Sequence, residues 1–198
     1  MNLTSVMTNF GFRTKLSLLM LIPLIGMLYF STQLVYERWV AIEQASQLEA
    51  LSEVAVKASA LVHELQKERG MSAGYVGSKG TKFVSKLPDQ RIKANARLQE
   101  LSPVLTGLDV ERFADDIRED LRTDVEGALA ELGKLSEMRQ SVTALEVLVA
   151  EPVRYYSNIN RMLLNIAGYT RHVSNSPEVV DMSSAYYYFL QSKERAGI

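Results

Sequence analysis

The sequence predicts an all-α protein, with an N-terminal transmembrane helix followed by an antiparallel helical bundle. Apolar residues recur every three or four positions over most of the chain, which is the spacing of amphipathic helices. Sustained alternation of apolar and polar residues is absent, so strands are not expected. With 198 residues, 47% of them hydrophobic, the chain is long enough to bury a sizeable core.

The first expected element is the uncharged segment LSLLMLIPLIGMLYFSTQLV at 16–35. Twenty residues match a bilayer core of about 30 Å. Arg13 and Lys15 precede the segment and the first acidic residue is Glu37, so we expect a cytoplasmic N-terminus at 1–15. The alternative is a cleaved signal peptide, since the most apolar run is short enough for one. The lack of a clear cleavage site and the helix-forming residues that follow favour an anchor.

A long first helix should follow, continuing through a connector at 36–49 into a helical domain at 50–198. Its core-facing stripe ends near the sequence GSKG at 77–80, where glycine is expected to stop the helix. The apolar positions of this helix share helical spacing: Leu48, Leu51, Val54, Ala58 and Leu65.

The rest of the chain predicts further helices separated by turn residues. A second helix runs from 83 to about Gly107, and the stretch 109–151 forms one long helix or two shorter ones. Pro152 should open the next helix, which reaches about Val173. After a turn at 174–181, a last helix is still uninterrupted where the sequence stops, so we expect a domain truncated at its C-terminal end.

Two arginines lie on apolar stripes and therefore should point into the bundle. Arg69 follows Leu65 at helical spacing, and Arg139 follows Leu135. An inward guanidinium needs either an internal carboxylate, such as Glu68, or an anionic ligand. Spacing alone favours the internal pair, although the planar guanidinium fork also suits a small oxyanion such as nitrate.

Other features limit the possible functions. The chain has no cysteine, only two widely separated histidines and no nucleophile beside a base, so we expect no metal, no cofactor, no catalytic residue and no enzyme activity. Its net charge of −1 argues against nucleic acid. The glycines at 70–80 fail the phosphate-loop pattern, but could serve close helix packing or an anion at a bent helix end. SKERAGI at the C-terminus echoes QKERG at 66–70 and adds Arg195.

Several stretches together resemble the NIT domain, the nitrate- and nitrite-sensing domain of bacterial receptors. They are LVHELQKERGMSAGYVGSKG, LPDQR, MRQSV, RYYSNINRMLLNI and YYYFLQSKERAGI. The resemblance covers about residues 50–198 and implies one complete and one partial four-helix bundle. It also implies anion-binding roles for Arg69, Arg139 and Arg195. The family's Gln-Arg motif usually continues to Thr-Asp, whereas Ala94 and Asn95 stand at those places here.

This resemblance leads us to expect a membrane-anchored extracytoplasmic sensor of chemotaxis or two-component signalling. We favour the N-terminal part of a methyl-accepting chemotaxis protein, held in the inner membrane with its sensor domain in the periplasm. Nitrate or nitrite would bind between inward-facing arginines, and a helix-packing change would cross the membrane. The expected partners are the anion, the membrane and a second copy of the chain, with no nucleic acid. The alternative is a helical interaction or dimerisation module without a ligand, in which internal glutamates neutralise the arginines.

Overall fold

The computed structural model describes residues 11–173 and 177–196, and all regular structure in these ranges is helical. The chain divides into two compact units, residues 1–44 and 45–198. Helix α2, Phe12–Gly77, contributes to both units. In the first unit its apolar side chains between Leu16 and Val35 are exposed. One helix of the described residues, Lys15–Gly77, contains a stretch long and apolar enough to cross a membrane, which is weak support for a span.

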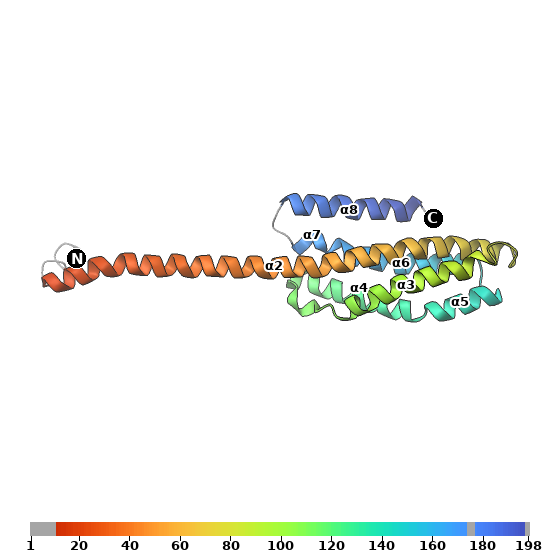
Figure 1. The fold of residues 1–198 in the computed structure, drawn as a ribbon, viewed down its shortest axis with the longest axis horizontal. Coiled ribbons are helices and arrows are strands. Elements are labelled where there is room, and N and C mark those ends of the chain that lie inside the picture. The colour runs from red at the N-terminus through yellow and green to blue at the C-terminus, as the bar shows by residue number, and fades with distance from the viewer. Residues whose placement is uncertain (1–10, 174–176, 197–198) are drawn as a thin grey trace. The chain divides into compact units, whose positions relative to one another are not determined.

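The second unit is an antiparallel bundle, as the sequence predicts (Figure 1). Helix α3, Lys86–Thr106, runs back along α2, and α4, Asp115–Gly133, reverses direction again after the short 3₁₀ helix η1, Val110–Arg112. Helix α5, Leu135–Ala144, continues along the same side as α4, and α6, Ala150–Gly168, completes the four-helix arrangement. The core comprises side chains from α2, α3, α4 and α6, with Leu61, Leu101, Leu121 and Leu163 fully buried.

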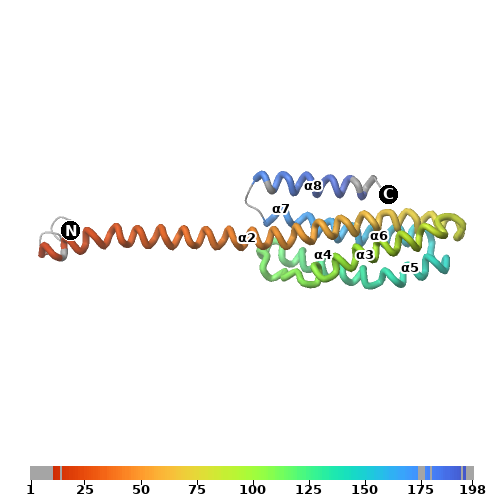
Figure 2. The backbone as a smooth tube through the Cα atoms, in the orientation of Figure 1, coloured from red at the N-terminus to blue at the C-terminus, as the bar shows by residue number. Residues whose placement is uncertain are grey.

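Two further helices follow α6: α7, Thr170–Val173, and α8, Pro177–Ala196. Figure 2 shows α8 returning beside the bundle in the direction of α2. Among the described side chains of α8, Leu190 and Glu194 are buried, whereas Tyr188 and Phe189 are exposed. Helix α8 approaches α6 closely at Gly168, where a Cβ atom would lie 2.7 Å from the Tyr187 ring. The absence of a side chain at Gly168 therefore allows that contact.

The helix boundaries confirm most of the predicted helix ends and turns. Helix α2 ends at Gly77, and Gly80 has the left-handed φ of +78° that glycine accepts readily. The stretch 109–151, left open between one helix and two, contains α4 and α5. The last helix begins at Pro177 rather than after the predicted turn, because proline fits the first turn of a helix, where its missing N–H is not needed.

Candidate functional site

The buried charges of the bundle gather around two consecutive residues of α2, Glu68 and Arg69. Glu68 is fully buried and Arg69 is 2% exposed. The prediction that Arg69 points inward is therefore confirmed, because the stripe that leads to it is also buried: Val54, Ala58, Val62 and Leu65.

Arg69 forms a buried ion pair with Glu194 of α8. Its Nη1 also donates to Ser157 Oγ at 2.6 Å. Glu194 is held from two other helices, since Gln66 Nε2 of α2 donates to its Oε2 at 2.7 Å and Asn160 Nδ2 of α6 at 3.1 Å. This pair thus joins the C-terminal part of α8 to α2 and α6.

Glu68 forms an ion pair with a different arginine, Arg139 of α5. Arg139 Nε and Nη2 donate to Oε1 and Oε2 of Glu68 at 2.7 and 2.8 Å, so the guanidinium and carboxylate meet in a two-bond fork. Burial alone would lower the pKa of Arg139, but the hydrogen bonds and charge of Glu68 outweigh it and raise the pKa. The Tyr156 hydroxyl also donates to Glu68 Oε1, at 2.8 Å. Burial and the charge of Glu68 raise the pKa of Tyr156, so this hydroxyl keeps its proton.

A third arginine, Arg91 of α3, lies against the same carboxylate. Its Nε is 3.7 Å from Glu68 Oε1, and this buried nitrogen makes no hydrogen bond within the described residues. The two terminal nitrogens donate to Thr143 Oγ1 at 2.9 Å and to the Arg139 carbonyl at 3.1 Å. Burial lowers the pKa of Arg91, and repulsion from Arg139 adds to the effect, against the opposing charge of Glu68.

Two of the three predicted ligand arginines, Arg69 and Arg139, therefore belong to two different ion pairs. Arg69 and Arg139 are brought into one charged layer, because Glu68 and Arg69 are neighbours on α2, but they pair with different carboxylates. Of the two alternatives that the sequence left open for an inward arginine, an internal glutamate is present for both. Arg195 follows Glu194 on α8, but its side chain lies outside the described part of the structure.

Sequence reasoning missed several side chains that contact these buried charges, among them Arg91, Asn95, Tyr156 and Glu194. Asn95 accepts a hydrogen bond from Arg139 Nη1 at 2.6 Å, so one of the two departures from the family pattern falls in the layer. Glu194 could have been found from the echo between QKERG and SKERA, because the structure pairs Arg69 of the first stretch with Glu194 of the second.

The glycine-rich stretch does not form an anion-binding loop. Helix α2 continues through Gly70 and Gly74, and the Gly80 N–H donates to the Tyr75 carbonyl at 2.9 Å. Gly74 serves packing, because a Cβ there would lie 2.5 Å from the Phe83 ring. Close approach, the other alternative considered for these glycines, therefore holds for Gly74.

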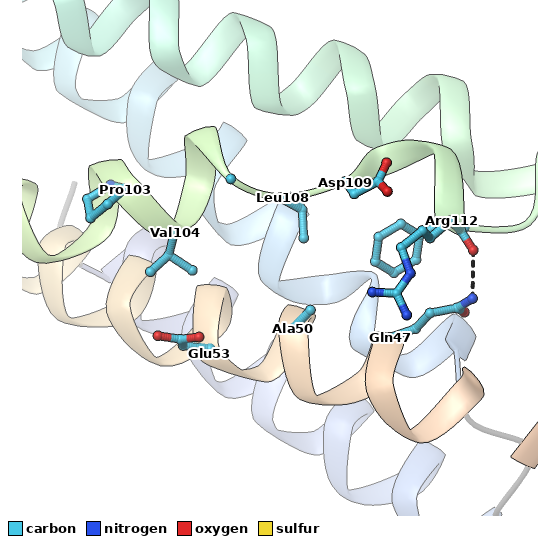
Figure 3. Close-up of a pocket in the computed structure, with 10 residues that line it drawn as sticks. Gln47, Ala50, Glu53, Pro103, Val104, Leu108, Asp109 and Arg112 are labelled. Atoms are coloured by element: carbon cyan, nitrogen blue, oxygen red, sulfur yellow. Dashed lines mark hydrogen bonds between the residues drawn. The ribbon is translucent and has the colours of Figure 1, made fainter. Parts of the chain in front are cut away.

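A separate cavity of about 270 Å³ lies near the start of α2 in this unit (Figure 3). Gln47 and Glu53 line it from α2, and Arg112 lines it from η1, with a hydrogen bond of 2.6 Å from Gln47 Nε2 to the Arg112 carbonyl. Arg69 lies 16 positions after Glu53 on α2, roughly 24 Å at 1.5 Å per residue. This cavity is therefore distinct from the charged layer.

Comparison with known proteins identifies the family. Residues 60–198 match NIT, described as nitrate and nitrite sensing, and the chain belongs to that family. The resemblance seen in the sequence is thereby confirmed.

Two named proteins are similar to this chain. The nitrate regulatory protein of Klebsiella oxytoca is 31% identical over 157 residues, which is 78% of this chain and 38% of the relative. The solved structure of the NasR transcription antiterminator is similar with a TM-score of 0.72 and 27% identity, over 85% of this chain and 45% of that one. The chain thus spans less than half the length of either protein.

These relatives correct two expectations. The membrane-anchored extracytoplasmic sensor of a chemotaxis protein is wrong as the functional class, because the relatives are a nitrate regulatory protein and a transcription antiterminator. An apolar N-terminal helix determines neither the output nor the functional class of the protein that contains it. The exclusion of nucleic acid is also wrong, because net charge is a property of this chain, whereas a relative with this fold acts in transcription.

Proposed function

We propose that this chain is a nitrate- or nitrite-responsive regulatory domain, and that it acts by binding rather than by catalysis. Membership of the sensing family supports the ligand class, and the names of the two relatives support a regulatory role. The candidate ligand residues are Arg69, Arg139 and Arg195. Residues 50–198 would form the ligand-binding domain.

The observation that carries this proposal is the buried Arg69–Glu194 pair. A nitrate ion offers a guanidinium two coplanar oxygens, as a carboxylate does, so it can take the place of Glu194 at Arg69. Glu194 would then be a buried carboxylate without its cation, which is unfavourable unless α8 moves. Ligand exchange at one arginine is thereby converted into a change in helix packing.

Calorimetric titration of the full chain in detergent, with nitrate, nitrite and chloride, tests this exchange. Arg69→Gln should weaken nitrate binding at least about tenfold, since it removes the charged fork. Glu194→Gln should strengthen binding, because the internal competitor loses its charge. Arg161→Gln is the matched control, because Arg161 is an exposed arginine of α6 that donates to Asn158. This variant should bind nitrate as the native chain does. Weaker binding by Glu194→Gln would contradict the exchange.

A helical interaction module without a ligand is the second candidate, and the carboxylates already paired with Arg69 and Arg139 favour it. A ligand that binds the native state alone raises the midpoint of thermal unfolding. A midpoint that stays the same in nitrate, nitrite and chloride would support this second candidate over the first.

We also infer that residues 16–35 place the chain at a bacterial cell membrane, with 1–15 before the span and 36–49 as a helical connector. The exposed apolar side chains of this segment support the inference. Cell fractionation should recover the chain with membranes after an alkaline wash, and a variant with Leu21→Lys and Ile25→Lys should shift to the soluble fraction, because charges are costly in hydrocarbon. Recovery of the native chain in the soluble fraction would refute the inference.

A further inference from the structure

An open hollow of about 390 Å³ lies beside the charged layer, between α3 and α5. Arg91 lines it from α3, and Ser136, Arg139, Gln140 and Thr143 line it from α5. Both guanidinium side chains are mostly buried, at 19% exposed for Arg91 and 12% for Arg139, so their positions are fixed by the packing of the bundle. Their exposed parts face a space that a small anion can enter.

The charges around this hollow do not balance. Arg91 and Arg139 are two cations, and Glu68 is the one carboxylate that contacts either of them within the described residues. Tyr156 adds no negative charge, because its raised pKa keeps the hydroxyl protonated. The group therefore carries one surplus positive charge, in contrast to the Arg69–Glu194 pair, whose charges cancel.

The hydrogen bonds are also incomplete. Each guanidinium has five N–H donors. Among the described residues, Arg91 donates two hydrogen bonds and Arg139 donates three. Glu68 is committed to the fork with Arg139 and to Tyr156, so Arg91 is the less compensated of the two cations. A guanidinium with a surplus charge and spare donors is suited to an oxyanion.

We propose that Arg91 and Arg139, with the polar side chains of Gln140 and Ser136, form a second binding site, which takes a small monovalent oxyanion. One such anion neutralises the surplus charge, so it binds without displacing a carboxylate. This site differs from the exchange at Arg69 in that respect. Occupancy joins α3 to α5 and leaves the contacts of α8 with α2 unchanged.

The test is calorimetric titration of the full chain in detergent with sodium nitrate, at constant ionic strength. Arg91→Gln should remove one binding event and leave the event that depends on Arg69. Gln140→Glu should weaken the same event without altering either arginine, because the new carboxylate in the hollow supplies the missing negative charge. We expect it to weaken that event about fivefold or more, the effect of one unit charge near 4 Å in water.

Two controls accompany these variants. Arg97→Gln removes an exposed arginine of α3 that pairs with Glu100, and Gln99→Glu adds a carboxylate to the exposed face of the same helix. Both should bind nitrate as the native chain does. Circular dichroism of each variant establishes that it is folded, and Gln140→Glu tests the site even if Arg91→Gln is unfolded.

The outcomes separate this site from the proposed exchange. If Arg69→Gln abolishes all nitrate binding while Gln140→Glu and Arg91→Gln change nothing, the second site is refuted and the exchange stands. If Gln140→Glu weakens binding and Arg69→Gln does not, the second site stands and the exchange fails. Equal weakening by Gln140→Glu and Gln99→Glu would reduce the effect to net charge and would also refute the site.

Discussion

At the scale of single residues, the charged layer depends on how completely each buried group is satisfied. Glu68 accepts from Arg139 by two bonds and from Tyr156 by a third, and it is fully buried. Removing a partner from such a group leaves a desolvated charge, which costs more than the bond itself contributes. The stability of the layer is thus sensitive to small changes at its uncharged members.

Tyr156→Phe is the mildest such change, because it removes one oxygen atom from a buried side chain. We expect the free energy of unfolding to fall by about 2 kcal/mol, since a hydrogen bond to a charged group is lost. Tyr155→Phe is the matched control, because that hydroxyl donates to the neutral carbonyl of Glu131 at 2.6 Å and is less buried. Denaturant unfolding of both variants measures the difference. A Tyr156→Phe variant no less stable than Tyr155→Phe would contradict the importance of the Glu68 contact.

At the scale of elements, the glycines between positions 70 and 80 have different structural roles, some inside α2 and one in the turn after it. Gly74 makes room for the Phe83 ring, and Gly80 occupies a left-handed turn. Gly70 is exposed, and a Cβ atom built on it would have no neighbour within 4 Å. Neither packing nor backbone conformation therefore requires a glycine at position 70.

Gly70→Ala should consequently stabilise the chain, by about 1 kcal/mol, because alanine loses less backbone entropy than glycine in a helix. Gly74→Ala, four residues further along α2, should destabilise it, since the new methyl would collide with the Phe83 ring. Thermal unfolding compares the two. If Gly70→Ala weakened nitrate binding or stability, Gly70 would have a role that the helix does not reveal.

At the scale of the whole molecule, the sequence predicted where the helices lie, but it did not predict which carboxylates pair with the buried arginines. Helix periodicity and glycine punctuation are local, so they located α2, α3 and the inward face of Arg69. The partners of the arginines are not local: Arg139 meets Glu68 across 71 positions, and Arg69 meets Glu194 across 125. The apolar face of a helix shows that a cation on it points inward, but it does not show which carboxylate pairs with that cation.

The predicted membership of the NIT family was confirmed, whereas the predicted membrane sensor was not. A resemblance carried by buried motifs reports the fold of a domain. The output of a regulatory protein depends on segments joined to that domain, and the matched relatives are more than twice as long as the part they share with this chain.

The adjacency of Glu68 and Arg69 on α2 also fixes the alignment of the helices. Successive helix residues point about 100° apart, so the two side chains address different neighbours at one height of the bundle. Sliding α2 by a single turn, about 5.4 Å, would still put apolar side chains against the apolar core, but both charges would lose their partners. The two ion pairs therefore fix the axial position of α2 relative to the helices around it. We expect any switching motion of α2 to be a tilt, since axial sliding or rotation about the helix axis would break both ion pairs at once.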